Sequence, residues 1–100
     1  MTPQEEAKQT VKAFCNAWFA LRDPRRTAEF LTDDIQFVGT GENEYARGKA
    51  EMTAYLEEDI REIAEPFSVE LPVILERELS DTIYMTSAAF TLRNLSLIHI

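Results

Sequence analysis

The sequence predicts a single α+β domain in which helices and an antiparallel β-sheet are largely segregated along the chain. Apolar residues recur at helical spacing near the start and in the middle of the chain, whereas apolar and polar residues alternate over the last third. The chain has 100 residues, and a chain of this length buries roughly 65% of its unfolded surface, which is enough for one core. Multi-domain enzymes are therefore excluded.

The first helix is expected to begin at Pro3. Thr2 and Glu5 have the spacing of a capping box, and proline is tolerated at the first helical position because an N–H there would have no partner. Further along, apolar side chains spaced by three and four residues form one stripe, which Cys15 widens. The stripe consists of Val11, Phe14, Trp18 and Leu21. One face of this helix should pack and the other should face water.

A shorter helix is expected from Pro24 to about Leu31. Asp23 and Pro24 again combine a capping residue with a proline that starts a helix. Three of its apolar side chains are predicted to be buried, namely Ala28, Phe30 and Leu31.

Two short strands should follow this helix. Ile35, Phe37 and Val38 form the first, which the turn residues 39–41 end, and residues 42–47 return as the second. A third helix is expected from Lys49 to about Ala64, with an acidic outer face. Its apolar residues at helical spacing are Met52, Tyr55, Leu56, Ile60 and Ile63.

The last third predicts a long antiparallel hairpin. From Phe67 to Leu75 every second residue is apolar, which is typical of a half-buried strand. Pro72 cannot donate a hydrogen bond to a neighbouring strand, so it marks an edge or a bulge. Residues 80 and 81 turn the chain into a second strand that is rich in β-branched and aromatic residues, from Thr82 to Arg93.

The charge of the chain restricts its partners. Ten Lys and Arg residues stand against 18 Asp and Glu residues, a net charge of −8, which disfavours nucleic acids and anionic membranes. Apolar runs stay well below the roughly 18 residues of a membrane span, and the N-terminus lacks the order of a signal peptide. The single cysteine forms no internal disulfide and is too few for a structural zinc site. We expect a cytoplasmic protein without a metal or cofactor.

Residues 95–100, LSLIHI, form an apolar segment with no closing turn. One interpretation is a natural end that supplies another strand. The other is a non-native tail, because the hexapeptide resembles the translation of a transposon-derived adapter used in sequencing libraries. We adopt the second, which makes residues 1–94 one domain with an incomplete sheet. His99, the only histidine, then carries no functional meaning.

Several segments resemble the SnoaL-like domains of the NTF2-like superfamily. They are WFALRD at 18–23, FLTDDIQF at 30–37, GTGE at 39–42 and Arg47-Gly48. The resemblance extends over roughly residues 3–93. It implies a cone in which N-terminal helices pack on a curved antiparallel sheet that encloses a pocket. It also implies two further strands after this chain's hairpin, and a homodimer formed through the sheet.

Resemblance to this superfamily leaves the activity open, because members include isomerases, dehydratases, polyketide cyclases and non-catalytic binding or sensory modules. The steroid-isomerase branch has a general-base aspartate where this chain has Gly39. That branch also has a tyrosine on the first helix, and residues 15–18 contain none. We therefore predict a binding or sensory domain. The alternative is a cofactor-independent isomerase, dehydratase or cyclase whose catalytic residues lie on missing strands.

The predicted ligand is a small apolar or aromatic molecule. A cone would bring four aromatic side chains from different elements to one cavity, where such residues offer a large contact area and polar tips. Glu44 lies near the expected mouth, although a surface ion pair with Arg47 is an alternative for it. Core packing is the alternative for the aromatic residues, which are Trp18, Phe37, Tyr45 and Tyr55. No residue is assigned a catalytic role.

Adjacent acidic residues and the lone cysteine are the remaining candidates. Asp33 and Asp34 could share a proton, but neighbours before a strand point apart, so we expect them to cap the helix-to-strand junction instead. Cys15 lies on the apolar stripe and is expected to act as a small hydrophobic residue.

Overall fold

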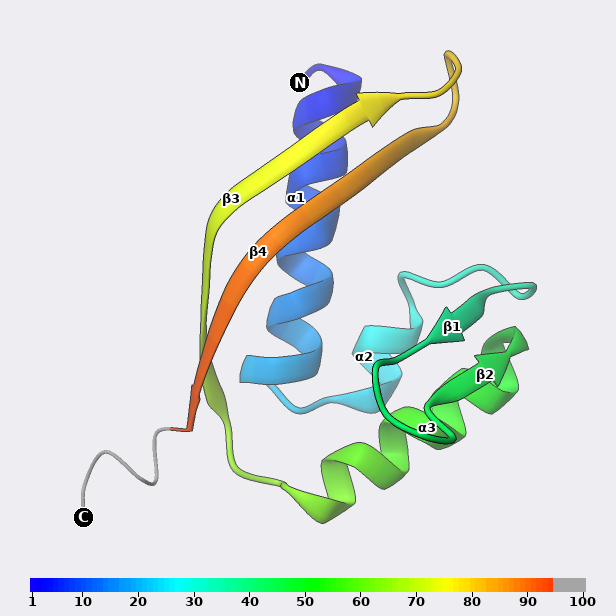
Figure 1. Cartoon of the computed structure of the whole chain (residues 1–100), viewed down its shortest axis with the longest axis vertical. Coiled ribbons are helices and arrows are strands. Elements are labelled where there is room, and N and C mark those ends of the chain that lie inside the picture. The colour runs from blue at the N-terminus through cyan, green and yellow to red at the C-terminus, as the bar shows by residue number, and fades with distance from the viewer. Residues whose placement is uncertain (95–100) are drawn as a thin grey trace.

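The computed structural model describes residues 1–94 and has the α+β architecture that the sequence predicts (Figure 1). The expectation for residues 95–100 lies outside the described residues. The elements in chain order are α1 (Pro3–Cys15), the π-helix η1 (Asn16–Ala20), α2 (Pro24–Ala28), β1 (Gln36–Val38), β2 (Tyr45–Arg47), α3 (Gly48–Glu62), β3 (Phe67–Glu78) and β4 (Tyr84–Asn94).

Strands β3 and β4 form a long curved hairpin that runs alongside α1 (Figure 1). Strands β1 and β2 pair antiparallel as a separate short hairpin that lies against α3. Within residues 1–94 the two hairpins are not hydrogen-bonded to each other. The long hairpin is therefore the curved part of the sheet. The short hairpin and α3 lie beyond the C-terminal end of α1, where α3 packs against α2 (Figure 1).

The first helix begins as predicted and ends in a way that the sequence pattern does not show. The Glu5 N–H donates to Thr2 Oγ1 (3.2 Å), which confirms the N-terminal cap. At residues 16–20 the helix widens to π geometry, and the Leu21 N–H donates to the Asn16 carbonyl five residues back (2.9 Å). The wider turn breaks the spacing of three and four residues. Leu21 is consequently 48% exposed, contrary to its predicted place on the packed stripe.

Helix α2 is shorter than predicted because its hydrogen bonding changes after Ala28. Asp23 caps its start by accepting from the Arg26 N–H (3.0 Å). Beyond the helix, the Phe30 N–H donates to the carbonyl three residues back rather than four (3.3 Å), which tightens the chain. Ala28 is buried as expected, but Phe30 is 39% exposed, so its predicted burial is wrong.

A bulge at Pro72 inverts the two faces of the long hairpin. Glu70 pairs with Thr91 and Val73 pairs with Ala89, so two residues of β3 face one residue of β4. The extra residue moves the following side chains to the opposite face. The predicted alternation holds up to Leu71, but beyond it Val73 and Leu75 are exposed, and Ile74 is the half-buried apolar residue.

The hydrophobic core lies between α3 and the β1–β2 hairpin. Met52 and Leu56 of α3 and Ala46 of β2 are buried together. Ile63 follows the end of α3 and is 46% exposed, so it does not continue the predicted apolar face. A buried leucine or methionine contributes roughly 1.5–3 kcal/mol, so this small cluster anchors the end of the molecule where the predicted site residues lie.

Replacing Gly48 with alanine should destabilise the protein by about 1–2 kcal/mol. Gly48 starts α3 with φ +82°, and its N–H donates to the Ile35 carbonyl (2.7 Å). An added Cβ meets only ordinary contacts, so the cost comes from the left-handed backbone. Urea denaturation of Gly48→Ala measures it, with Lys49→Ala as a control expected within about 0.5 kcal/mol of the parent. Equal stabilities of the two variants would contradict the conformational argument.

Candidate functional site

Three of the predicted site residues meet in one group, which we call the aromatic cluster. It consists of Trp18 from η1, Phe37 from β1 and Tyr55 from α3. The ring centroids are 6.0 Å apart for Trp18 and Phe37, 6.5 Å for Trp18 and Tyr55, and 4.9 Å for Phe37 and Tyr55. All three rings are half-buried and pack against the hydrophobic core. Such edge and tilted pairs contribute about 0.5–1.5 kcal/mol each.

Asp59 of α3 fixes the polar edge of the aromatic cluster. Its Oδ2 atom accepts a hydrogen bond from Trp18 Nε1–H (2.9 Å) and a longer one from the Arg22 guanidinium (3.4 Å). The Arg22 side chain is only 6% exposed, whereas that of Asp59 is 36% exposed. The indole therefore has one orientation, set by a carboxylate that the arginine holds in turn.

Arg22 also caps the C-terminal end of α3. Its Nε and Nη2 atoms donate to the Ile63 carbonyl (3.0 and 2.7 Å), and Nη1 donates to the Trp18 carbonyl (3.1 Å). Its guanidinium carbon lies 5.3 Å from the ring centroid of Phe67, at the start of β3. Carbonyls at a helix end lack partners within the helix, so one side chain satisfies them and joins three elements. The sequence pattern does not signal this role, because Ile63 is 41 residues away.

Beside the aromatic cluster lies a surface depression of about 210 Å³, which we call the Tyr55 depression. Glu44 is held at its rim, because its Oε2 accepts from the Gly41 N–H (2.5 Å). Burial raises the pKa of Tyr55, and the negative charges of Glu44, Asp59 and Glu62 raise it further. The phenol therefore stays protonated at neutral pH and can donate a hydrogen bond. The residues lining the depression are Glu44, Tyr55, Glu58, Asp59 and Glu62.

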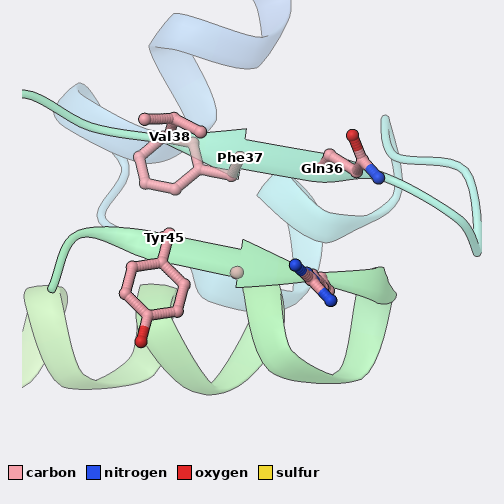
Figure 2. Close-up of a pocket in the computed structure, with 6 residues that line it drawn as sticks. Gln36, Phe37, Val38 and Tyr45 are labelled. Atoms are coloured by element: carbon pink, nitrogen blue, oxygen red, sulfur yellow. The ribbon is translucent and has the colours of Figure 1, made fainter.

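Tyr45 lies apart from the aromatic cluster. Phe37 pairs with Ala46 and Val38 pairs with Tyr45, so Phe37 and Tyr45 belong to opposite faces of the hairpin. Tyr45 is 64% exposed, and Figure 2 shows its hydroxyl end directed away from β1. Tyr45 borders a hollow of about 220 Å³ formed by the short hairpin (Figure 2).

Glu44 and Arg47 do not form the ion pair that was the alternative for Glu44. Within residues 1–94, the ion pairs involve other side chains. The backbone N–H of Arg47 instead donates to Glu51 Oε1 (3.0 Å) and thereby caps α3. Among the described residues, the Glu44 carboxylate is thus bound to the turn that precedes it, and it lines the same depression as Tyr55.

The other candidates contribute structure rather than chemistry. Burial raises the pKa of the half-buried Cys15 thiol, which suppresses the reactive thiolate. The Asp33 carbonyl accepts from the Lys49 N–H (3.1 Å) and joins the strand entry to α3.

Residues 1–94 contain no group of three or more His, Cys, Asp or Glu side chains that could hold a metal ion. In the same range, no helix is long and apolar enough to cross a membrane.

A curved antiparallel hairpin runs along a long helix, and aromatic residues gather at one end, which is an α+β arrangement consistent with an NTF2-like domain. Residues 7–94 match the family of SnoaL-like domains, and the chain belongs to that family. The match confirms the resemblance seen in the sequence. No curated protein and no solved structure matches the chain. Family membership indicates small-molecule binding or an isomerase-type function.

Replacing Arg22 with alanine should destabilise the protein by about 2–3 kcal/mol, because two backbone carbonyls and a partly buried carboxylate lose their donor. Arg61→Ala is the matched control. Arg61 also pairs with a carboxylate of α3, at 2.7 Å from Glu58, but both side chains are more than half exposed, so its loss should cost below about 1 kcal/mol. Urea denaturation compares the two variants. Equal losses would show that Arg22 is an ordinary surface arginine.

Alkaline pH should destabilise the protein through Tyr55. A tyrosine ordinarily titrates near pH 10, and a raised pKa in the folded state means that the native protein holds this proton more tightly than the unfolded chain. The resulting stabilisation is complete below about pH 10 and is lost as the pH rises through the folded-state pKa. Denaturation as a function of pH should show a smaller alkaline decline for Tyr55→Phe than for Tyr45→Phe. The same decline in both variants would refute the assignment.

Proposed function

We propose that this chain is a small-molecule-binding or sensory domain without catalytic activity, and that its ligand is a small apolar or aromatic molecule held beside the aromatic cluster. Family membership supports the binding of a small molecule. The observation that carries the location is the meeting of Trp18, Phe37 and Tyr55 from three elements next to an open depression. Ligand sites need apolar contact area and a few oriented polar groups; here the Tyr55 ring supplies the former and the surrounding carboxylates supply the latter.

The proposed binding mode assigns a part to each residue. The ligand packs on the accessible side of Tyr55, and Trp18 and Phe37 keep the phenol ring in place from behind. The protonated Tyr55 hydroxyl donates a hydrogen bond to an oxygen or nitrogen of the ligand. Glu44 at the rim accepts one from a ligand donor. The surrounding carboxylates disfavour anionic ligands, because like charges repel in a partly desolvated site.

The lack of catalysis is supported by the position of Gly39. Its N–H donates to the Glu44 carbonyl (2.6 Å) in the turn after β1, where the resemblance places a general-base aspartate in steroid isomerases. The alternative function is a cofactor-independent isomerase, dehydratase or polyketide cyclase with catalytic residues outside residues 1–94. Steady conversion of a bound ligand would favour that alternative over the binding domain.

We further propose a homodimer formed through the outer face of the β3–β4 hairpin. On this face Val73, Leu75 and Met85 are 46%, 64% and 49% exposed. The bulge turns the first two outward, and an apolar stripe of this kind favours association. We also infer a cytoplasmic location, because the single cysteine is a free thiol.

A neutral aromatic probe, 2-naphthol, should bind saturably and raise the melting temperature by mass action. Trp18 is the only tryptophan, so its fluorescence reports on the aromatic cluster directly. Tyr55→Phe removes one hydrogen bond and should weaken binding severalfold. Tyr45→Phe removes the same hydroxyl from the other face of the hairpin and should leave the affinity unchanged. Equal effects of the two variants, or no saturable binding, would overturn the proposed site.

A further inference from the structure

A groove runs between α1 and β3, away from the aromatic cluster. One part is a hollow of about 360 Å³ lined by Lys12, Asn16, Val69 and Leu71. The second part, of about 340 Å³, shares Lys12 and Leu71 and extends along β3. We call the two together the α1–β3 groove. Each part has the size of a small-molecule site. The second part is lined by Lys8, Lys12, Leu71, Pro72, Val73 and Ile74.

The β3 bulge builds the apolar wall of this groove. Leu71 and Pro72 stand together opposite one residue of β4, which bends the strand where the two hollows join. The inverted alternation also places Leu71 and Ile74 on the side that faces α1. Without the bulge, residues 71 and 74 would point to opposite faces. The bend and the apolar wall therefore have the same origin.

The helix wall of the groove is positively charged in a strongly acidic chain. Lys8, Lys12 and Asn16 are spaced by four residues and lie on one face of the helix. Lys8 is already engaged, with its Nζ atom 3.6 Å from Glu76 Oε2. Lys12 has no carboxylate of residues 1–94 within ion-pair distance. A cation without a partner thus stands at the junction of the two hollows, opposite apolar side chains.

We propose that the α1–β3 groove binds an amphipathic monocarboxylate with an alkyl chain. The ligand carboxylate accepts hydrogen bonds from Lys12 Nζ and the Asn16 side-chain amide, and its alkyl chain lies along Val69, Leu71 and Ile74. Charge complementarity carries this choice, because Lys12 lines both hollows opposite apolar side chains and attracts an anionic head group there. The groove shares no residue with the Tyr55 depression, so this inference goes beyond the proposed function.

Calorimetric titration of decanoate into the full chain tests the proposal. We expect saturable binding at one site, and at least tenfold weaker binding by Lys12→Gln, because a charge-assisted hydrogen bond is lost. Lys49→Gln removes the same charge from α3 and should bind like the parent. Decan-1-ol has the same chain without the carboxylate, and should bind more weakly than decanoate and equally to the parent and Lys12→Gln.

A gain of affinity sharpens the test. Glu76→Gln releases Lys8 from its ion pair, so a second cation becomes available and decanoate should bind about threefold tighter or more. Unchanged or weaker binding by Glu76→Gln, or equal affinity of Lys12→Gln and the parent, would overturn the proposal. The outcome does not depend on the Tyr55 depression, because Tyr55→Phe should leave decanoate binding unchanged. Loss of decanoate binding in that variant would likewise count against a separate groove.

Discussion

The arrangement of the molecule depends on the guanidinium of Arg22. It donates to carbonyls at the end of α3 and in η1, pairs with Asp59, and lies over the ring of Phe67. These contacts join η1, α3 and the start of β3 around one buried side chain. Arg22 itself has φ +51°, a conformation that costs a non-glycine residue roughly 1–2 kcal/mol. Its multiple charge-assisted hydrogen bonds offset that cost.

The same contact links stability to the candidate site through Asp59. One carboxylate oxygen accepts from both Arg22 and the Trp18 indole, and the negative charge of Asp59 helps to raise the pKa of Tyr55. A change at Asp59 would therefore alter the helix end, the orientation of the indole and the protonation of the phenol together. Asp59, which pairs with Arg22 at the end of α3, also lines the Tyr55 depression. Effects of substitutions at these positions are consequently not additive.

Sequence alone predicted those features that depend on neighbouring residues. The cap at Thr2, the helix start at Pro24 and the irregularity at Pro72 are local and were found. Features that depend on an inserted residue were found only in part, because each insertion shifts a periodic pattern. The π-turn before Leu21 was missed, and the bulge expected at Pro72 was found without its effect on the alternation that follows. Beyond such a shift, side chains assigned to the interior become exposed.

The candidate site was predictable only where it depends on local apolar patterning or on the family resemblance. Apolar patterning placed Trp18 and Tyr55 on packed helix faces, and family resemblance brought Phe37 to them. The face occupied by Tyr45 follows from the pairing of Phe37 with Ala46, and the six-residue connection between the strands does not fix that register. The contacts of Arg22 were not predictable, because its partners lie in distant elements. Charge was informative only after folding, because the acidic depression and the lysine-lined groove occupy separate places, and the net charge of the chain describes neither of them.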